Sequence, residues 1–484
     1  MELGRQLNSD IVYLNMMGQP LIILNSAEAA SGLLEKRSAN HSDRLSVPMV
    51  SDPSLLDWSG FIGMLPYSDL WRRQRRRANE WLNIRAVHQF DGLQQEEVRL
   101  LLGRLLDIPS STGIFERVKE QFFFTTGSAT FKLAYGYRFK DNQDPFFLNA
   151  VEAIEVLFKA TIPGKFLVNV FPALSYMPDW FPGTGWKYTA RKWREQKNRA
   201  VDGPYEWTKR QVATGNFEPS VLSALLQDHQ LDSGLSDTDR EKELKELAFV
   251  LFLAGMDTVG YSFHASYHKQ LILIFLKNKT ATALVNFVAA MIINPEAQAK
   301  AQAEIDRVLG YGARLPTASD EARLPYVRNL ILEVLRWQPV GPTGGPPHAC
   351  YQDDVYRGYD IQKGTVFIGN VWAMSRDEAV YKDPEHFDPD RFLDPKVPPV
   401  PGFGWGRRKC PGIHFAEMSL FLTISSLLSV FSFSRKMDEN GKEIIPKIEA
   451  SGNHFVLALK PFEFELRPRS DRHLQLILEN VPGQ

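Results

Sequence analysis

The sequence predicts a mainly helical protein with a small β-rich lobe. Long stretches, above all residues 87–245, have the pattern of helices. Short apolar runs at residues 11–15 and 21–25, separated by a turn with glycine and proline, predict a pair of strands. By length alone the 484 residues could form about three domains, but no linker rich in glycine and serine and no run of like charges divides residues 1–484, which is also compatible with one large helical fold.

Four segments follow the two strands in the first half of the chain. Residues 26–37 are typical of a helix, with Ser26 as its N-cap, and residues 44–66 of an apolar loop. The arginine-rich run 70–77 and the apolar run 246–258 predict two further helices, the second of them buried.

The second half of the chain adds helices and short strands. Residues 280–294 and 325–337 predict helices, and each run stops at or just before a proline. Residues 358–361 and 366–370 predict strands of a small sheet, and the alternation over residues 455–466 predicts a closing hairpin.

Composition excludes several classes of protein. The net charge of −1 gives no general attraction to nucleic acid. Two cysteines, Cys350 and Cys410, argue against a disulfide-built secreted domain. We see no signal peptide and no apolar run of about 18 residues, the length that spans a membrane.

The most informative stretch surrounds Cys410. It follows a glycine-rich loop that begins near Phe403, and an apolar, helix-like run at residues 413–431 comes after Gly412. A helix N-terminus favours an anion, so a cysteine in this place is held as thiolate, the form that binds a metal. Arg408 can pair with an acidic group of whatever is bound. The alternative is a buried structural cysteine in a turn.

The pattern Phe403-Gly-x-Gly-x-Arg408-x-Cys410-x-Gly412 resembles the haem-binding loop of the cytochrome P-450 family, in particular its fungal-type microsomal members. The resemblance implies that Cys410 is the axial ligand of the iron of haem b. Its thiolate pushes electron density onto the iron. It also implies the family's fold, a single helix-rich domain with a small β-rich lobe.

Two further motifs concern the haem carboxylates. Trp71 and Arg75 share one side of a helix, because they are four residues apart. They resemble the family's Trp-x-x-x-Arg element, whose side chains reach a haem propionate, and His348 lies where members often place another propionate contact. The five arginines between residues 72 and 77 are a solvated helix face or a docking face for an acidic reductase rather than a nucleic-acid patch.

An acid–alcohol pair, Asp257-Thr258, interrupts the apolar run 246–258. Buried polar groups need partners and are often functional. With Ala254-Gly255 before them, the two are similar to the family's oxygen-activation motif, in which they handle protons. The alternative is a threonine bonded to its own helix backbone.

Glu333 and Arg336 share one face of the 325–337 helix. Their apolar neighbours predict burial, where each charge must be paired. They match the family's Glu-x-x-Arg element, and the resemblance implies that Arg391 is the third member of a structural triad.

Residues 259–279 depart from the family pattern. Joining Thr258 directly to Thr280 restores both that pattern and a continuous helix. Every valine codon begins with GT and a lysine codon can end in AG, so Val259 and Lys279 permit both borders of an intron. We therefore interpret the 21 residues as an intron retained in frame, which implies a catalytically impaired splice product.

The resemblance implies a monooxygenase of secondary metabolism that inserts one atom of O₂ into an apolar organic substrate. Electrons come from NADPH through a partner reductase. It also implies a monomer on the cytosolic face of the endoplasmic reticulum membrane. No N-terminal anchor is visible before the first strand, so we expect either a late start or a soluble form. A haem–thiolate isomerase or dehydratase is the other catalytic alternative. The sequence does not identify the substrate.

Overall fold

The computed structural model describes residues 2–16, 18–109, 113–162, 164–228, 235–256, 279–451 and 456–482, with the backbone alone at 254–256 and 279. The long helices of this part, in chain order, are α4 (Asp69–Leu82), α5 (Asp91–Leu106), α6 (Ile114–Tyr135), α7 (Pro145–Thr161), α8 (Gly185–Thr214), α10 (Asp237–Met256), α11 (Lys279–Ile293), α12 (Pro295–Leu309), α13 (Pro325–Trp337), α15 (Ile413–Val430) and α16 (Asp471–Asn480).

Short helices join them. They are α1 (Glu2–Gln6), α2 (Ala27–Ala30), η1 (Ser31–Glu35), α3 (Pro48–Ser51), η2 (Ala86–Phe90), η3 (Leu167–Asn169), η4 (Pro172–Tyr176), α9 (Val221–Gln227), η6 (Ala318–Arg323), α14 (Val371–Met374), η7 (Pro389–Leu393) and η8 (Gly406–Arg408). The predicted N-cap is confirmed, because the Ser26 hydroxyl accepts a bond from the Ala29 amide. The helix expected over residues 26–37 divides into α2 and the π-helical turn η1.

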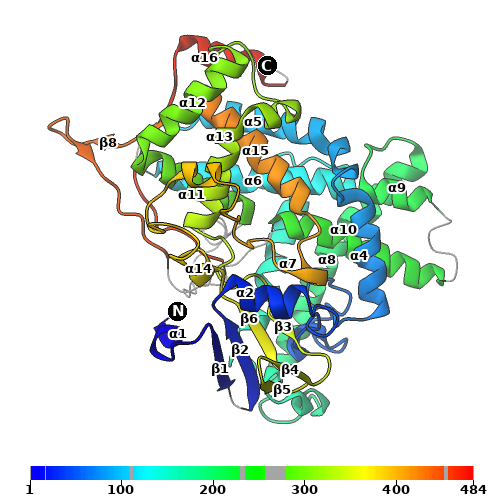
Figure 1. Ribbon diagram of the computed structural model, residues 1–484. Helices are drawn as coiled ribbons and strands as arrows, with labels where there is room; N and C mark the ends of the chain where they lie inside the picture. Colours follow the sequence, from blue (N-terminus) through cyan, green and yellow to red (C-terminus); the bar gives the residue numbers. More distant parts are fainter. Residues whose placement is uncertain are drawn as a thin grey trace.

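The largest sheet has the strand order β1-β2-β6-β3 (Ile11–Met16, Gln19–Leu24, Val366–Gly369 and His348–Ala349). The predicted pair of strands is β1 and β2, which are antiparallel, with Ile11 opposite Leu24. β2 then pairs in parallel with β6, so residues 21–24 lie beside residues 366–369. Figure 1 shows this sheet at one end of the molecule, with helices filling the rest. The predicted fold class, mainly helical with a small β-rich lobe, is confirmed.

Three smaller antiparallel pairs are β4 with β5 (Asp354–Tyr356, Tyr359–Ile361), β7 with β10 (Phe431–Ser434, Glu465–Pro468) and β8 with β9 (Lys436–Met437, Glu443–Ile444). The hairpin expected over residues 455–466 is therefore wrong in the partner of its last residues, because β10 pairs with β7. Earlier in the segment, Leu459 does form an antiparallel bridge with a near neighbour, Ala450. Phe462, Phe464 and Leu466 are buried, as the alternation predicts.

The central helices α6, α10, α11 and α15 together carry a large share of the buried apolar side chains of the main core. Among the described residues one helix, α15, has the length and apolar character of a membrane span. Most of it is buried inside the fold, because it is the core helix that follows Cys410.

Candidate active site

The Cys410 loop has a backbone shape that depends on glycine. Gly404 and Gly406 have left-handed φ angles of 78° and 51°. A Cβ on Gly406 would lie 2.4 Å from the Leu34 carbonyl oxygen, so no other residue fits there. The Cys410 amide donates to the Phe403 carbonyl at 2.8 Å, which closes the loop around the sulfur. Gly412 is the N-cap of α15, and a Cβ there would meet the Cys410 sulfur at an ordinary 4.0 Å.

Trp405 fixes this loop to the β lobe. Its ring fills the space beside Gly344 and Gly369, where an added Cβ would lie 2.4 Å and 2.1 Å from ring carbons. Trp405 is buried in the same small core as β2 and β6. The position of Cys410 is therefore set by the sheet as well as by α15.

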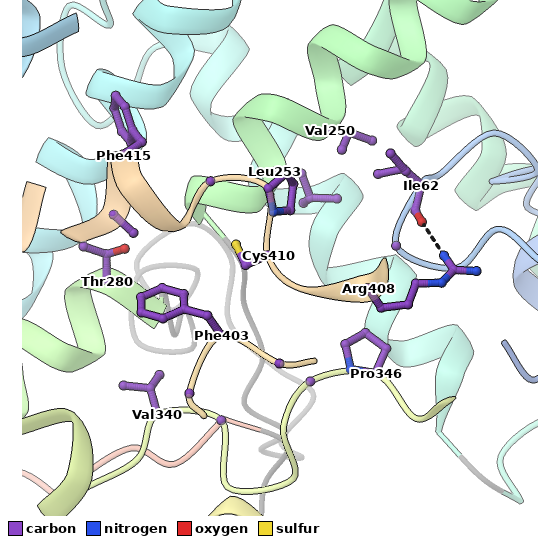
Figure 2. Close-up of a pocket in the computed structure, with 18 of the residues that line it drawn as sticks. Ile62, Val250, Leu253, Thr280, Val340, Pro346, Phe403, Arg408, Cys410 and Phe415 are labelled. Carbon is purple, nitrogen blue, oxygen red and sulfur yellow. Dashed lines mark hydrogen bonds between the residues drawn. The ribbon is translucent and has the colours of Figure 1, made fainter. Parts of the chain in front are cut away.

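Cys410 opens into a cavity of about 350 Å³. Figure 2 shows the sulfur between Phe403, Leu253 and Phe415, with Arg408 to one side. α10 and α11 contribute one wall, through Val250, Leu251, Leu253, Thr280 and Ala283. Most of the remaining lining is apolar, which suits an apolar organic molecule.

Arg408 lies at the polar end of the cavity. Its guanidinium donates to the carbonyls of Ser42, Ile62 and Leu65 and lies 4.4 Å from the centre of the Trp71 ring. Burial lowers its pKa, and Arg44 and Arg75 act in the same direction. An arginine nevertheless keeps its charge at neutral pH, because its intrinsic basicity is so high.

Arg75 comes to the same place from α4. It lies one helical turn after Trp71, 5.8 Å from the centre of that ring, as the spacing of four requires. Its guanidinium donates to the Lys409 carbonyl at 2.7 Å. Burial lowers the pKa of Arg75, and the charge of Cys410 acts in the opposite direction, which reflects how close the two groups are.

Arg44 is a member of this cluster that the sequence reasoning missed. It donates to the carbonyls of Gly63, Pro346 and Pro347, and it lines the cavity. No motif marks it. One signal was available, since Arg44 is the only basic residue in the apolar segment 42–66.

His348 completes the polar end of the cavity. Its Nδ1 bonds the His41 carbonyl at 2.8 Å, so Nδ1 carries the proton and Nε2 remains for another partner. Burial lowers the pKa of His348 to about 3, with further repulsion from Arg44, so the ring is neutral here. An anion bound beside it would favour the protonated ring.

These side chains suit a haem. The hydrogen bonds of Arg44, Arg75 and Arg408 go to backbone carbonyls, and none of the three forms an ion pair in the described part of the chain. Three guanidinium groups that lie close together inside a protein need anionic partners, because their buried positive charges repel one another. Haem b offers two carboxylates, and its iron takes a thiolate such as Cys410. The donor set therefore fits the cofactor.

Glu333, Arg336 and Arg391 form a buried ion cluster that joins α13 to η7. Arg336 makes two bonds to the Glu333 carboxylate, at 2.7 and 2.8 Å, and both side chains are fully buried. Arg391, from η7, adds a third bond at 3.0 Å. Backbone carbonyls such as that of Ser375 take further donors of Arg336.

Asp257 and Thr258 lie outside the described residues, as do 259–278 of the predicted insertion. Of the described helices, α10 ends at Met256, and the next one, α11, begins at Lys279.

A sequence model of the family described as Cytochrome P450 matches residues 3–264 and 278–466 of the chain. The chain belongs to the cytochrome P450 family. It is a monooxygenase of that family, an oxidoreductase with haem iron, since its curated relatives carry that name. A cytochrome P450 monooxygenase of Armillaria gallica is 34% identical over 483 residues, which cover 99% of this chain and 88% of the relative.

Other P450 relatives are similar over comparable lengths. Cytochrome P450 monooxygenase 208 of Postia placenta is 36% identical over 468 residues, covering 95% of this chain and 84% of the relative. Tryptamine 4-monooxygenase of Psilocybe cyanescens is 33% identical over 489 residues, covering 99% and 89%. The fold is similar to a solved zebra fish cytochrome P450 with progesterone, with a TM-score of 0.74, 22% identity and coverage of 97% and 98%.

Proposed function

We propose that residues 1–484 form one P450 domain that holds haem b through Cys410 and inserts one atom of O₂ into an apolar organic substrate. NADPH supplies the electrons through a partner reductase. The observation that carries the proposal is the cavity itself, in which a cysteine faces apolar walls beside three arginines that form no ion pair within the described residues.

Bound haem would supply the activation of O₂, and the residues of the chain would hold the haem and the substrate in place. Arg44, Arg75 and Arg408 hold the two carboxylates, with Trp71 packed against two of these arginines and His348 beside them. Phe403 covers the sulfur from one side of the cavity (Figure 2). The apolar walls orient the substrate and exclude water.

The roles of Asp257 and Thr258 rest on the resemblance. There they hold and move protons during oxygen activation. An isomerase or dehydratase of the same cofactor class needs no external electrons, so dependence of product formation on NADPH separates it from the monooxygenase.

The carboxylate contacts predict how firmly haem is held. Arg44→Gln should weaken haem binding about 10- to 100-fold, because a hydrogen bond between charged groups contributes about 1.5–3 kcal/mol. Transfer of haem to apomyoglobin measures this. Arg435→Gln is a matched control, since Arg435 also bonds backbone carbonyls, those of Ile292 and Ile293. If both variants lose haem at the same rate, Arg44 does not contact a haem carboxylate.

A partner reductase needs a binding surface near Cys410. The contacts of the basic residues on α4 and in the Cys410 loop indicate which of them can form that surface. Arg77 is buried against Glu243 of α10 and does not belong to that surface, whereas Arg73 binds the same carboxylate with a side chain that stays 42% exposed. Arg72 and Arg76 are exposed on α4, and Arg407 and Lys409 are exposed in the Cys410 loop. The bond from Arg75 to the Lys409 carbonyl joins these two elements. The resulting basic surface suits an acidic partner.

The proposed location is the cytosolic face of the endoplasmic reticulum membrane. Exposed aromatic residues between α7 and α8 support contact with a membrane: Phe171, Tyr176, Trp180 and Phe181. We propose a monomer of secondary metabolism with an apolar organic substrate. Tryptamine, named for one relative, is one compound to test.

The predicted insertion sets the decisive experiment. The family model leaves residues 265–277 unmatched, inside the segment 259–279, which supports its being foreign to the fold. A reduced carbon-monoxide difference spectrum should show the red-shifted thiolate band for a chain lacking 259–279, and a weaker band or none for the full chain. Equal bands would show that the segment is tolerated. No band in either chain would overturn the proposed haem ligation.

A further inference from the structure

Glu246 on α10 has a carboxyl group close to the cavity wall that bonds to no group among the described residues. It precedes Val250, which lines the cavity, by one helical turn. In the described part of the chain it forms neither a hydrogen bond nor an ion pair. Its carboxyl lies against Gly60, where an added Cβ would fall 1.5 Å from Oε2. Burial raises the pKa of Glu246 to about 7.

Gly60 belongs to a segment, residues 57–64, whose inner part forms a wall of the cavity. The carbonyls of Ile62 and Gly63 are held by Arg408 and Arg44. The outer end is held differently, because Lys197 of α8 donates to the Asp57 carbonyl at 2.8 Å. Segment 57–64 is therefore bonded to two arginines at its inner end, and at its outer end to Lys197 of α8 and, through the Trp58 amide, to the Val50 carbonyl.

Asp57 itself is a strained point of the segment. Its φ is 54°, in the left-handed region that residues other than glycine rarely adopt. The bond from Lys197 and a bond from the Ser59 hydroxyl to its carboxylate stabilise this conformation. Loss of the Lys197 tie would favour a change of backbone here.

Four charged groups surround Glu246. Lys242 and Glu243 share its helix, Lys197 faces it from α8, and Asp57 from segment 57–64. Glu243 is occupied by two arginines of α4, at 2.7 Å each, and Lys242 is exposed. Lys197 is thus the cation that an ionised Glu246 can attract, and within the described part of the chain its side chain donates one hydrogen bond, to a neutral carbonyl.

We propose that Glu246 is a proton-controlled latch on segment 57–64 of the substrate cavity. When protonated, its carboxyl rests on Gly60 while Lys197 holds the Asp57 carbonyl, and the wall is closed. When ionised, it draws Lys197 from Asp57, and the outer end of segment 57–64 opens. The inference rests on the proposed function for what the cavity binds, but the latch operates without cofactor.

The direction of the pH effect follows from proton linkage. In the closed state Glu246 titrates near pH 7, whereas an exposed glutamate titrates near 4.5. The closed state therefore binds the proton more tightly, and raising the pH from about 4.5 to 7 favours opening by up to about tenfold per pH unit. Above about pH 7 both states are ionised, and the effect levels off.

Amide hydrogen exchange of residues 57–64 in the full chain tests the latch. After correction for intrinsic rates, exchange should rise by about twentyfold between pH 5.5 and 7.5. Glu246→Gln cannot ionise, so its exchange should stay slow at both values. Glu241→Gln is the matched control, because Glu241 on the same helix is paired with Lys209 and Lys245 and should leave the pH dependence unchanged.

A pH-independent wild type, or a Glu246→Gln variant that behaves like wild type, would overturn the proposal. In Glu246→Ala, the pH dependence of exchange at residues 57–64 should also be lost. This second variant replaces Glu246→Gln if Glu246→Gln fails to fold. The carbon-monoxide spectrum tests haem ligation separately, so either idea can fail without the other.

Discussion

Replacing the thiolate should abolish the function. In Cys410→Ser, we expect no red-shifted band in the reduced carbon-monoxide difference spectrum and turnover at background. A serine hydroxyl does not supply the electron density with which a thiolate favours cleavage of the O–O bond. The loss should exceed the roughly 10- to 100-fold that removal of an outer partner of a metal ligand costs. The measurement is best made on the chain lacking 259–279.

Cys350→Ser is the matched control for this variant. Cys350 is buried, and its sulfur bonds the Gln352 carbonyl. Burial raises the pKa of its thiol to about 11, so it is not a thiolate at neutral pH. Its replacement should leave the band in place. A band that survives in Cys410→Ser and disappears in Cys350→Ser would reassign the ligand.

The second large effect concerns stability. Glu333→Gln should lower the free energy of unfolding by about 3–5 kcal/mol, because it leaves the buried charges of Arg336 and Arg391 without their carboxylate. Glutamine keeps the size of the side chain, so packing is not the cause. Urea denaturation monitored by circular dichroism measures the change.

An exposed pair provides the comparison for Glu333. Asp390→Asn removes the ion pair between Asp390 and Lys300. The two side chains are 42% and 52% exposed, respectively. That change should cost about 1 kcal/mol or less, because water screens the pair. If both variants lose the same amount, the Glu333 cluster does not stabilise the fold in the way proposed.

Local geometry made much of the site predictable. Trp71 and Arg75 lie together because four residues make about one helical turn, and Glu333 meets Arg336 for the same reason. These contacts depend only on a helix being present. The Ser26 cap was predictable on the same ground, since a cap acts within one turn.

Contacts between distant parts of the chain were harder to predict. Arg44 joins the cluster through carbonyls about 300 residues away, and nothing near it in the sequence reports that. The strand at residues 465–468 has the expected burial but pairs with β7, because alternation specifies a face and not a partner. The burial of Arg77 was likewise not predictable from α4 alone, because its partner Glu243 lies on another helix.

The parallel pairing of β2 with β6 has a consequence for biosynthesis. Residues 21–24 leave the ribosome early, but their partners at 366–369 follow after most of the chain has been translated. The bond of Arg408 to the Ser42 carbonyl spans 366 residues in the same way. The pocket proposed for the haem carboxylates is thus among the last parts of the nascent chain to assemble, and we expect cofactor loading to follow near-complete translation.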